Sequence, residues 1–511
     1  MTDVGEIPII EFLKDKIYLG AYDAAPADTR RRVHFTIDDV LPYNNFHHDF
    51  GPLSVAHLYR FAVILHEVLG EEENAGKGVV FYSSTDPRAR ANAACVLCSY
   101  MVLIQSWPPH LALAPVAQAM PPLMPFRDAG YSVADFGITV QDVVYGVWRA
   151  KENNLIDIRN FNLDEYEHFE MVENGDLNLI APHFVAFASP VQDDYNAPLT
   201  PAFEQVLDYF SAHDVRLVVR LNSHLYNREE FIKRDIKHID LIFDDGTCPS
   251  MLFVQAFIGA VEGVIKEGGK VAVHCRAGLG RTGCLIGAHL IYTYGFTAQE
   301  AIAYMRFLRP GMVVGPQQHW LYLHQNEFRE WRRTMTLSRL ADDSLAGYSP
   351  LIPVEESMLS PRRITSASSP PRTPERSILS SIGSSHNALP VPTPGQPRKS
   401  PSPLRVVSHN HSIAGPRASK YNSISSSAAD NTTNSDNEDN GRDGNIITMA
   451  KSRRNMTEQN IQHEKVIGRQ LRVVSNPSPR RRRQFSGVDM PSSPMRRTSR
   501  VSSMMPSGVH K

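Results

Sequence analysis

The residues best suited to chemistry lie in the stretch VAVHCRAGLGRTG, at positions 271–283. An apolar run ends there at Cys275, and Arg281 follows six residues later with two glycines between them. A packed thiol at the end of a strand would account for the cysteine, but not for the glycines and the arginine at these spacings. The pattern instead predicts that Cys275 is a nucleophile.

The loop between Cys275 and Arg281 is suited to bind an anion. Gly278 and Gly280 permit backbone torsions that let successive N–H groups surround one point, and the following helix adds its positive dipole end. The same field lowers the pKa of a thiol, so a thiolate is expected at neutral pH, with help from the neighbouring His274. The predicted phosphate-binding residues are Arg276, Ala277, Gly278, Leu279, Gly280 and Thr282.

Three further side chains would complete a phosphoenzyme mechanism. Arg281 presents a planar fork that can hold two phosphoryl oxygens. Asp245, in the turn-rich stretch LIFDDGTCPS, is the favoured general acid and Asp244 the lesser candidate, although such a residue can simply cap a turn. Gln317, next to Gln318 in VVGPQQHWL, can orient a hydrolytic water; an ordinary amide at a helix start is the plain alternative.

Composition limits the class of protein. The 511 residues are 42% apolar, enough for more than one core, and five cysteines are too few for a disulfide scaffold. The chain starts without a charged-then-apolar leader, so we expect a reducing intracellular compartment. Its apolar stretches are shorter than the roughly 18 residues of a membrane span, so we expect no membrane partner. Because no cluster with metal-ligand spacing stands near the loop, we expect no metal and no other cofactor.

Charge is divided unevenly along the chain. Residues 1–340 carry 29 Lys and Arg against 41 Asp and Glu, whereas residues 341–511 carry 24 against 13. The acidic part is expected to attract basic partners, and it disfavours nucleic acid as a partner.

The chain beyond residue 340 is rich in Ser, Pro, Asn and Arg and has no sustained apolar periodicity. Such a segment cannot offset a backbone entropy of roughly 1 to 2 kcal/mol per residue, so it is predicted to be disordered. Nine Ser-Pro or Thr-Pro dipeptides lie in it, and six of them continue as Ser/Thr-Pro-x-Arg. Proline-directed kinases are therefore expected partners. The basic run Arg480 to Arg483 indicates nuclear import, or merely keeps the tail solvated.

The first 335 residues show the pattern of two αβ units. In the second unit, apolar runs and the capping-box spacing of Thr297 and Glu300 predict two strands and two helices, at 215–222, 269–275, 281–296 and 297–311. In the first unit, the same reasoning predicts a helix, a strand and a helix, at 51–70, 78–82 and 91–104.

The first unit repeats one spacing of the second. Ser84 and Arg90 are separated by the same six-residue step as Cys275 and Arg281, and each pair follows a Val-rich strand. Either the first unit is a duplicated copy that lacks the cysteine, which we favour, or two common supersecondary units are similar by chance. We expect Ser84 and Arg90 to be structural rather than a vestigial anion site.

The run HCRAGLGRTG resembles the signature of the cysteine-dependent protein tyrosine and dual-specificity phosphatases. Together with DEYEHFEMVENGDLNLI, DDGTCPS and RPGMVVGPQQH, and with FGPL, RANAA and PFRDA in the first unit, it makes residues 8–335 resemble the cell-division-cycle-fourteen type. The resemblance implies an α/β protein with two tandem dual-specificity-phosphatase-like αβα domains packed together and a disordered tail. The implied parts are a non-catalytic domain, a linker helix with acidic groove residues, a catalytic domain and a regulatory tail, at 1–150, 151–175, 176–338 and 339–511.

For function, the resemblance implies removal of phosphate from tyrosine and from Ser-Pro and Thr-Pro sites made by cyclin-dependent kinases, with a downstream basic residue favoured. It implies action in mitotic exit and cytokinesis, at the nucleus and nucleolus, the cytoplasm, and the spindle pole or centrosome. The implied catalytic residues are Cys275 as nucleophile, Arg281 as phosphate clamp, Asp245 as acid and Gln317 beside the water. The implied substrate-groove residues are Asp128, Glu167, Glu170 and Asp176. Without the resemblance, Glu167, Glu170 and Asp176 are read as a solvated helix face.

Other uses of the same loop are less well matched. A phosphoinositide or nucleic-acid 5′-end phosphatase is disfavoured by Leu279, where lipid phosphatases place a lysine, and by the acidic globular part. A non-catalytic phosphopeptide-binding scaffold would not need Cys275, Arg281 and a positioned acid together. A sulfurtransferase would leave Arg281, Asp245 and Gln317 unexplained.

Overall fold

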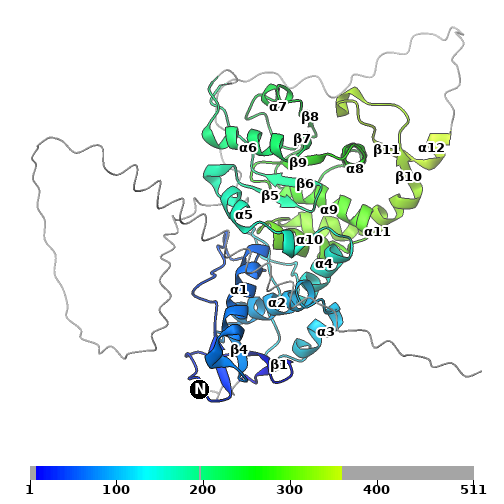
Figure 1. Cartoon of the computed structure of the whole chain (residues 1–511). Helices are drawn as coiled ribbons and strands as arrows, with labels where there is room; N and C mark the ends of the chain where they lie inside the picture. Colours follow the sequence, from blue (N-terminus) through cyan, green and yellow to red (C-terminus); the bar gives the residue numbers. More distant parts are fainter. Residues whose placement is uncertain (1–6, 195–196, 359–511) are drawn as a thin grey trace, which may run out of the picture.

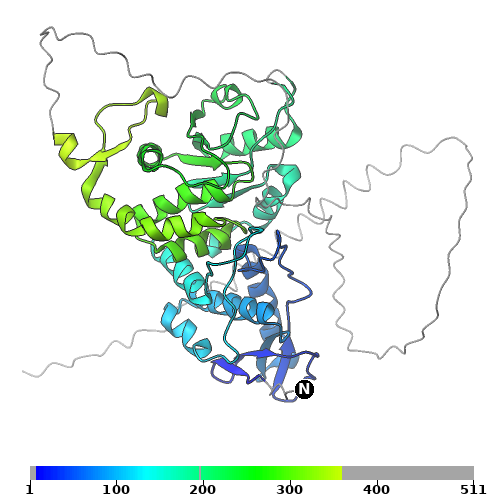
Figure 2. The same ribbon diagram turned by 180° about the vertical axis from the view of Figure 1, so that it is seen from behind.

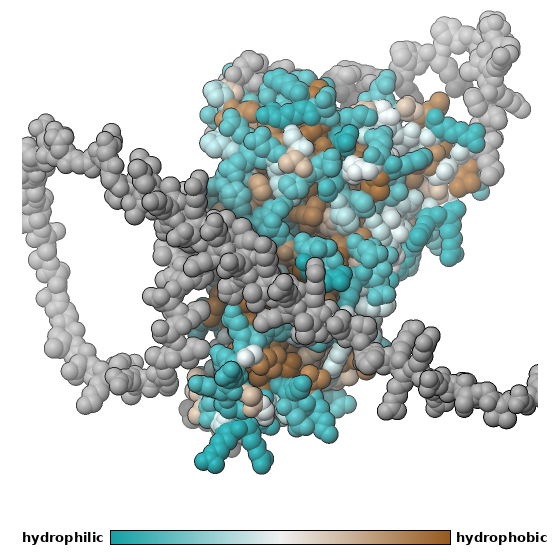
Figure 3. Space-filling model, in the orientation of Figure 1, coloured by the Kyte–Doolittle hydropathy of each residue, from teal (hydrophilic) through white to brown (hydrophobic). Residues whose placement is uncertain are grey.

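Two α/β units, each built on a mostly parallel sheet, are stacked in the computed structural model (Figure 1). The structure describes residues 7–194 and 197–358. Hydrophilic side chains dominate the face of both units seen in Figure 3, with apolar residues scattered among them. Within the described residues, none of the helices has the length and apolar character needed to cross a bilayer.

The first unit holds a four-stranded sheet of order β1-β2-β4-β3, in which only β1 is antiparallel. Its strands are β1 Ile10–Leu13, β2 Ile17–Ala21, β3 Arg32–Phe35 and β4 Gly78–Ser83. Its helices are α1 Val55–Gly70, α2 Pro87–Leu103, α3 Pro109–Leu113 and α4 Val140–Glu152. The central strand β4, GVVFYS, is apolar almost throughout because both of its faces are covered.

The helices of the first unit differ slightly from those predicted at 51–70 and 91–104. The first begins at Val55, behind the N-cap Ser54. The second begins four residues early, at Pro87, because the Asp86 side chain accepts the first free N–H groups and proline suits the first turn.

The second unit holds a five-stranded sheet of order β5-β6-β9-β7-β8, with β5 antiparallel to β6 and the others parallel. Its strands are β5 Leu177–Ile180, β6 Phe184–Phe187, β7 Val215–Arg220, β8 Lys237–Asp240 and β9 Lys270–His274. Its helices, after the linker helix α5 Leu163–Glu170, are α6 Pro201–Ala212, α7 Glu229–Ile232, α8 Met251–Lys266, α9 Gly280–Tyr294, α10 Ala298–Leu308 and α11 Pro316–Thr334. The predicted strands and helices of this unit are therefore present, with ends shifted by at most three residues.

The central strand β9 is covered on both faces. Val271 and Val273 pack in the cluster that includes α8 and α9, while Ala272 packs in the cluster that includes α6, as the alternation of a strand requires. The functional loop leaves the carboxyl end of this strand, the edge of an open α/β sheet where ligands bind.

The helix α4 joins the two units. A Cβ on its Gly146 would lie 2.7 Å from the carbonyl oxygen of Glu300 in α10, so the two helices pack closely. Arg149 Nε donates to Glu300 Oε2 at 2.7 Å, and the Tyr304 hydroxyl donates to the Leu155 carbonyl at 3.2 Å. Figures 1 and 2, from opposite sides, both show α4 beneath the helices of the second unit. One apolar cluster runs through both units, so the prediction of two packed domains is confirmed.

The predicted end of the folded part, at residue 338, is wrong. Strands β10 Met335–Leu337 and β11 Leu351–Pro353 pair in antiparallel fashion, and α12 Val354–Met358 follows. Between the strands, Tyr348 is buried against the Cα of Gly263 in α8, and Leu345 is buried too. A few apolar residues therefore order residues 339–358 by packing against distant parts of the chain. The composition of this segment is mostly polar, so the sequence alone does not indicate this packing. The rest of the predicted tail, with Arg480 to Arg483, lies outside the described residues.

Candidate active site

The sulfur of Cys275 lies at the base of the loop that joins β9 to α9. The residue directly follows β9, its side chain is fully buried, and α9 begins at Gly280. A strand end, a tight loop and a helix start are thus placed within six residues of one another. This is the arrangement that points backbone N–H groups at a single anion.

Opposing influences act on the Cys275 thiol. Burial, the largest of them, raises its pKa, but the positive charge of Arg281 and the hydroxyl and backbone N–H of Thr282 lower it. The net result is a pKa below the ordinary value for cysteine. The sulfur therefore carries a greater share of thiolate at neutral pH than a free cysteine does.

The expectation that a charged His274 helps to lower the pKa of the Cys275 thiol is wrong. Burial lowers the pKa of this imidazole to about 3, so the ring is neutral at physiological pH. Its Nδ1 lies 3.0 Å from the carbonyl oxygen of Cys275. The ring therefore forms a hydrogen bond with the phosphate-binding loop, residues 275–281, which we call the cradle. It adds no positive charge near the sulfur.

The cradle owes its shape to Gly278 and to an arginine that the sequence reasoning missed. Gly278 has a φ of 66°, and a Cβ there would collide with the Phe187 carbonyl. The buried Arg309 donates to the carbonyls of Gly278 (3.1 Å) and Ala277 (2.9 Å). Because Arg309 holds these two carbonyls on the far side of the cradle, the backbone N–H groups of the cradle point toward the bound anion. The position of Arg309 in RPGMVVGPQQH was the available signal.

We expect Gly278→Ala to be far more damaging than Gly295→Ala. Both glycines have a positive φ, but nothing lies within 4 Å of a Cβ at Gly295, the C-cap of α9. Gly295→Ala should cost only about 1 to 2 kcal/mol of unfolding free energy, the conformational penalty. Gly278→Ala should cost more and should also lower phosphatase activity by about a hundredfold or more, because the cradle must open. Denaturant melts and turnover by both variants test this, and equal effects would contradict it.

Arg281 is held in place by backbone carbonyls and faces the candidate acid. Its Nη1 donates to the carbonyls of Leu221 (3.2 Å) and Phe243 (2.9 Å), and its Nη2 lies 3.0 Å from Asp245 Oδ1. The neighbouring Asp244 is exposed, and its carbonyl closes a turn instead. Of the two acid candidates, only Asp245 points its carboxylate over the cradle.

The two glutamines of VVGPQQHWL point in different directions. Gln317 is fully buried, its Nε2 donates to the Thr247 carbonyl at 3.0 Å, and a Cβ on Gly280 would lie 2.5 Å from its Oε1. Gln318 instead accepts a hydrogen bond of 2.7 Å from Arg306. Gln317 therefore connects the cradle with the loop that carries Asp245 and Thr247. An amide in this position can hold a water molecule beside the phosphorus of a bound phosphoryl group.

Two of the four predicted groove residues are buried in internal contacts. Asp128 Oδ2 accepts the Gly315 N–H at 2.7 Å, which ties the loop before α11 to the first unit. Asp176 Oδ1 lies 3.0 Å from Arg309 Nη1, behind the cradle. Both residues are at most 6% exposed, so the expectation that they offer charge to a substrate does not match their position. They support the site's loops instead.

The other two groove residues lie on α5, between the units. Glu167 forms a bidentate pair with Arg60, at 2.7 and 2.6 Å, and both side chains are about one third exposed. Glu170 lies close enough to Tyr43 and Tyr166 to contribute to the raised pKa of each phenol, which burial chiefly causes. The assignment of Glu167 and Glu170 to a substrate groove stays a prediction.

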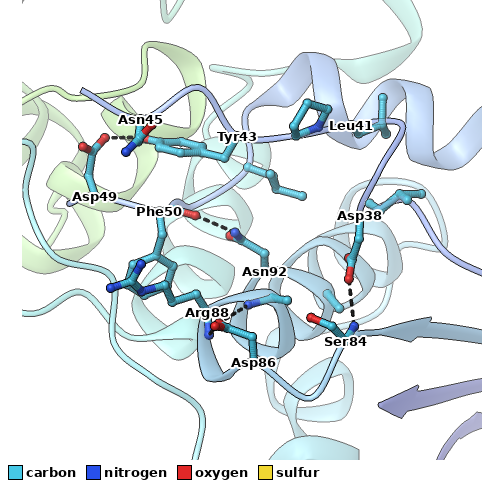
Figure 4. Close-up of a pocket in the computed structure, with 15 residues that line it drawn as sticks. Asp38, Leu41, Tyr43, Asn45, Asp49, Phe50, Ser84, Asp86, Arg88 and Asn92 are labelled. Atoms are coloured by element: carbon cyan, nitrogen blue, oxygen red, sulfur yellow. Dashed lines mark hydrogen bonds between the residues drawn. The ribbon is translucent and has the colours of Figure 1, made fainter. Parts of the chain in front are cut away.

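The first unit's copy of the loop holds carboxylates where the cradle would hold phosphate (Figure 4). Asp86 Oδ1 accepts the N–H groups of Arg88 (2.6 Å) and Ala89 (3.4 Å) at the start of α2. Asp38 Oδ2 accepts the N–H of Ser84 at 2.8 Å. Because these donors are occupied and like charges gather there, the copy is unsuited to bind an anion.

Arg90, the counterpart of Arg281, also points elsewhere. It donates to the Pro121 carbonyl at 2.8 Å and does not line the pocket of about 460 Å³ in front of Ser84. The structural role expected for Ser84 and Arg90 fits this geometry.

In chemical terms, the second unit combines a thiolate, a guanidinium, a carboxyl group and an amide around one anion-sized cradle. Within the described ranges, no group of three His, Cys, Asp or Glu side chains is arranged to hold a metal ion. The set is suited to transfer a phosphoryl group to sulfur and then to water.

Comparison with known protein families matches both units. Residues 11–150 match the model "Dual specificity protein phosphatase, N-terminal half", and residues 199–327 match "Dual specificity phosphatase, catalytic domain". The two matched segments correspond to the first unit, which has Ser84 in place of the reactive cysteine, and to the second unit, which contains Cys275.

Similar proteins occur in yeasts and in animals. The tyrosine-protein phosphatase CDC14 of Candida albicans is 56% identical over 411 residues, which cover 77% of this chain and 76% of the relative. CDC14 of Saccharomyces cerevisiae is 60% identical over 362 residues, 70% of this chain and 66% of the relative. The human dual specificity protein phosphatase CDC14A is 39% identical over 318 residues, 61% and 52% of the two chains.

Proposed function

Because this chain belongs to the CDC14 family of dual-specificity protein phosphatases, we propose that it acts on phosphoserine and phosphothreonine followed by proline, and on phosphotyrosine. Within the Ser/Thr-Pro class, it favours a basic residue downstream. Protein phosphatase activity itself follows from family membership and agrees with the prediction from HCRAGLGRTG. The observation that supports a thiol mechanism is the position of Cys275, whose pKa is lowered, at the floor of a cradle over which Arg281 and Asp245 form an ion pair.

In the first step, the Cys275 thiolate attacks phosphorus, so that the S–P bond forms as the bond to the leaving oxygen breaks. Arg281 and the cradle N–H groups hold the three equatorial oxygens, where charge builds up. Without substrate, Asp245 is paired with Arg281 at 3.0 Å. A bound phosphate dianion takes over the guanidinium and releases Asp245, which as a carboxylic acid gives its proton to the leaving oxygen.

In the second step, water attacks the phosphocysteine. The S–P bond breaks, inorganic phosphate forms, and the sulfur leaves as a thiolate. Asp245, now ionised, accepts the proton of the water, while the Gln317 amide orients the water. Gln317 suits this task because its side chain already bridges the Thr247 carbonyl and the cradle helix.

The preference for a basic residue is supported by charge. Residues 1–340 carry 41 acidic against 29 basic side chains, and Glu167 lies in a partly exposed pair with Arg60. A substrate arginine that replaces Arg60 in this pair would keep a bidentate contact while bringing its own phosphate toward the cradle.

The partners that the family implies are phosphorylated proteins. We extend this to substrates of cyclin-dependent kinases, to kinases that modify the Ser/Thr-Pro sites beyond residue 358, and to action in mitotic exit and cytokinesis at the nucleus, nucleolus, cytoplasm and spindle pole or centrosome. The support for this extension is the shared motifs and the Ser/Thr-Pro-x-Arg sequences of the chain.

Paired phosphopeptides test the proposal. The full chain, without added metal, should hydrolyse pSer-Pro-x-Arg at least about tenfold faster in kcat/KM than pSer-Ala-x-Ala, since one charged contact is worth on the order of 1.4 kcal/mol. Cys275→Ser should show no turnover of either peptide.

A second variant distinguishes the contribution of the predicted substrate groove from that of the cradle. The double variant Glu167→Gln, Glu170→Gln should lose only the preference for the arginine-containing peptide. Turnover that is indifferent to peptide sequence would contradict the proposed specificity, while turnover that survives Cys275→Ser would contradict the thiol mechanism.

A further inference from the structure

Behind the cradle, one phenol lies between two imidazoles. The Tyr226 hydroxyl is 2.7 Å from Nε2 of His274 and 2.8 Å from Nε2 of His238. Tyr226 is 1% exposed, and both imidazoles are shielded from solvent, with His274 fully buried. Because burial excludes bulk solvent from these groups, their protons must be shared among themselves.

The proton positions on His274 follow from its partner at the other side. Its Nδ1 lies 3.0 Å from the Cys275 carbonyl oxygen, which can only accept, so Nδ1 carries the proton. Because the ring is neutral, Nε2 must then be an acceptor. The hydroxyl of Tyr226 therefore donates to His274.

The single proton of the Tyr226 hydroxyl decides the state of His238. Since Tyr226 donates to His274, its oxygen can only accept from the second imidazole, so Nε2 of His238 carries a proton. Burial lowers the pKa of His238 to about 3, so this ring is also neutral and its Nδ1 has none. Nδ1 of His238 is buried and makes no hydrogen bond, and Asp240 Oδ1 lies 3.8 Å from it, beyond hydrogen-bonding distance.

We propose that Tyr226 and His238 are positioning residues for phosphoryl transfer, acting through a directed relay from His238 to Tyr226 to His274 to the Cys275 carbonyl. The relay holds one tautomer and one orientation of His274, and it thereby fixes the peptide plane that carries the sulfur. It rests on the assignment of Cys275 as the reacting thiol. Neither residue touches the substrate; their effect reaches the reaction only through His274.

Charged groups lie at both ends of the relay. At the far end, Arg220 forms a bidentate pair with Asp240, at 2.7 and 3.1 Å, and donates to the Tyr226 carbonyl at 3.1 Å. His224 and Arg228 approach Asp240 at 3.8 and 3.9 Å. At the near end, the sulfur faces the groups already described, which are Arg281, Asp245 and Thr282. The relay between them is uncharged, so it acts by orientation.

The test is the pH dependence of alkylation of Cys275 by iodoacetate in the full chain, with Cys275→Ser to identify the reacting thiol. Tyr226→Phe leaves two buried nitrogens without partners and frees His274 to adopt the other tautomer, whose Nδ1 lone pair would face the Cys275 carbonyl. The alkylation profile should move to higher pH, and kcat/KM at pH 7 should fall by about tenfold.

Two matched comparisons separate positioning from stability. His238→Gln keeps an amide N–H that can donate to Tyr226, so it should show a smaller shift of the profile than His238→Leu. Tyr304→Phe removes another fully buried hydroxyl, one that donates to Leu155, and should lower the melting temperature without moving the profile.

An unmoved alkylation profile in Tyr226→Phe, or equal shifts in His238→Gln and His238→Leu, would overturn the relay. Because alkylation needs no peptide, this failure is distinguishable from a failure of the proposed substrate preference.

Discussion

Arg281→Lys is expected to lower kcat/KM by about a thousandfold while the chain stays folded. Lysine keeps the charge but not the planar fork, so it cannot hold two phosphoryl oxygens at once. The guanidinium is aimed by the carbonyls of Leu221 and Phe243, an alignment that a single ammonium cannot reproduce. Loss of one preorganised contact to developing charge typically costs a hundredfold to a thousandfold, and here the remaining charge also loses its alignment.

Steady-state kinetics with a pSer-Pro-x-Arg peptide would measure this loss. Arg159→Lys, in the exposed ion pair with Asp157, is a suitable control and should leave activity near that of the parent. The pKa of the Cys275 thiol should rise less in Arg281→Lys than in Arg281→Ala, because the charge of Arg281 is the leading influence that lowers it. Nearly full activity in the Arg281→Lys variant would mean that charge alone suffices.

Asp245→Asn is expected to reduce kcat for phosphoserine peptides by about a hundredfold to ten-thousandfold. A serine alkoxide leaves poorly unless it is protonated, and an amide cannot supply that proton. An aryl phosphate with a weakly basic leaving group should lose far less. This dependence on the leaving group identifies a general acid and would be absent if Asp245 only held Arg281 in place.

The neighbouring carboxylate provides the control for this variant. Asp244 is exposed and its side chain does not face Arg281, so Asp244→Asn should change turnover little. Although Asp245→Asn should slow turnover, it should make the Cys275 thiol easier to ionise. The charge of Asp245 raises the pKa of Cys275, so its removal should lower that pKa and shift alkylation by iodoacetate to lower pH. An equal loss of activity toward the phosphoserine peptide and the aryl phosphate would contradict the assignment.

The local parts of the site could be predicted from the sequence because their geometry is set within a few residues. Cys275, the glycines and Arg281 belong to one strand-loop-helix segment, so their spacing is enough to define a cradle. The capping box of Thr297 and Glu300 is likewise local, and it is present at the start of α10. The family resemblance and the two packed α/β domains also followed from motifs in order along the chain.

Choices between neighbouring or distant residues needed the tertiary structure. Asp245 rather than Asp244, and Gln317 rather than Gln318, face the cradle because separate loops meet there, and their orientation depends on packing between segments 30 to 42 residues from Cys275. The order of residues 339–358 depends in the same way on contacts with α8, far away in the chain.

Burial decided the charge states that the sequence left open. A histidine next to a nucleophile can be charged or neutral, and only the enclosed position of His274, beside Tyr226, makes it neutral. An acidic residue can bind a substrate or stabilise a loop of its own protein. Because Asp128 and Asp176 are buried, they stabilise loops. The amino-acid order therefore determined which groups react, through local spacing, whereas the tertiary fold decided their protonation and direction, because desolvation and long-range contacts exist only once the chain is folded.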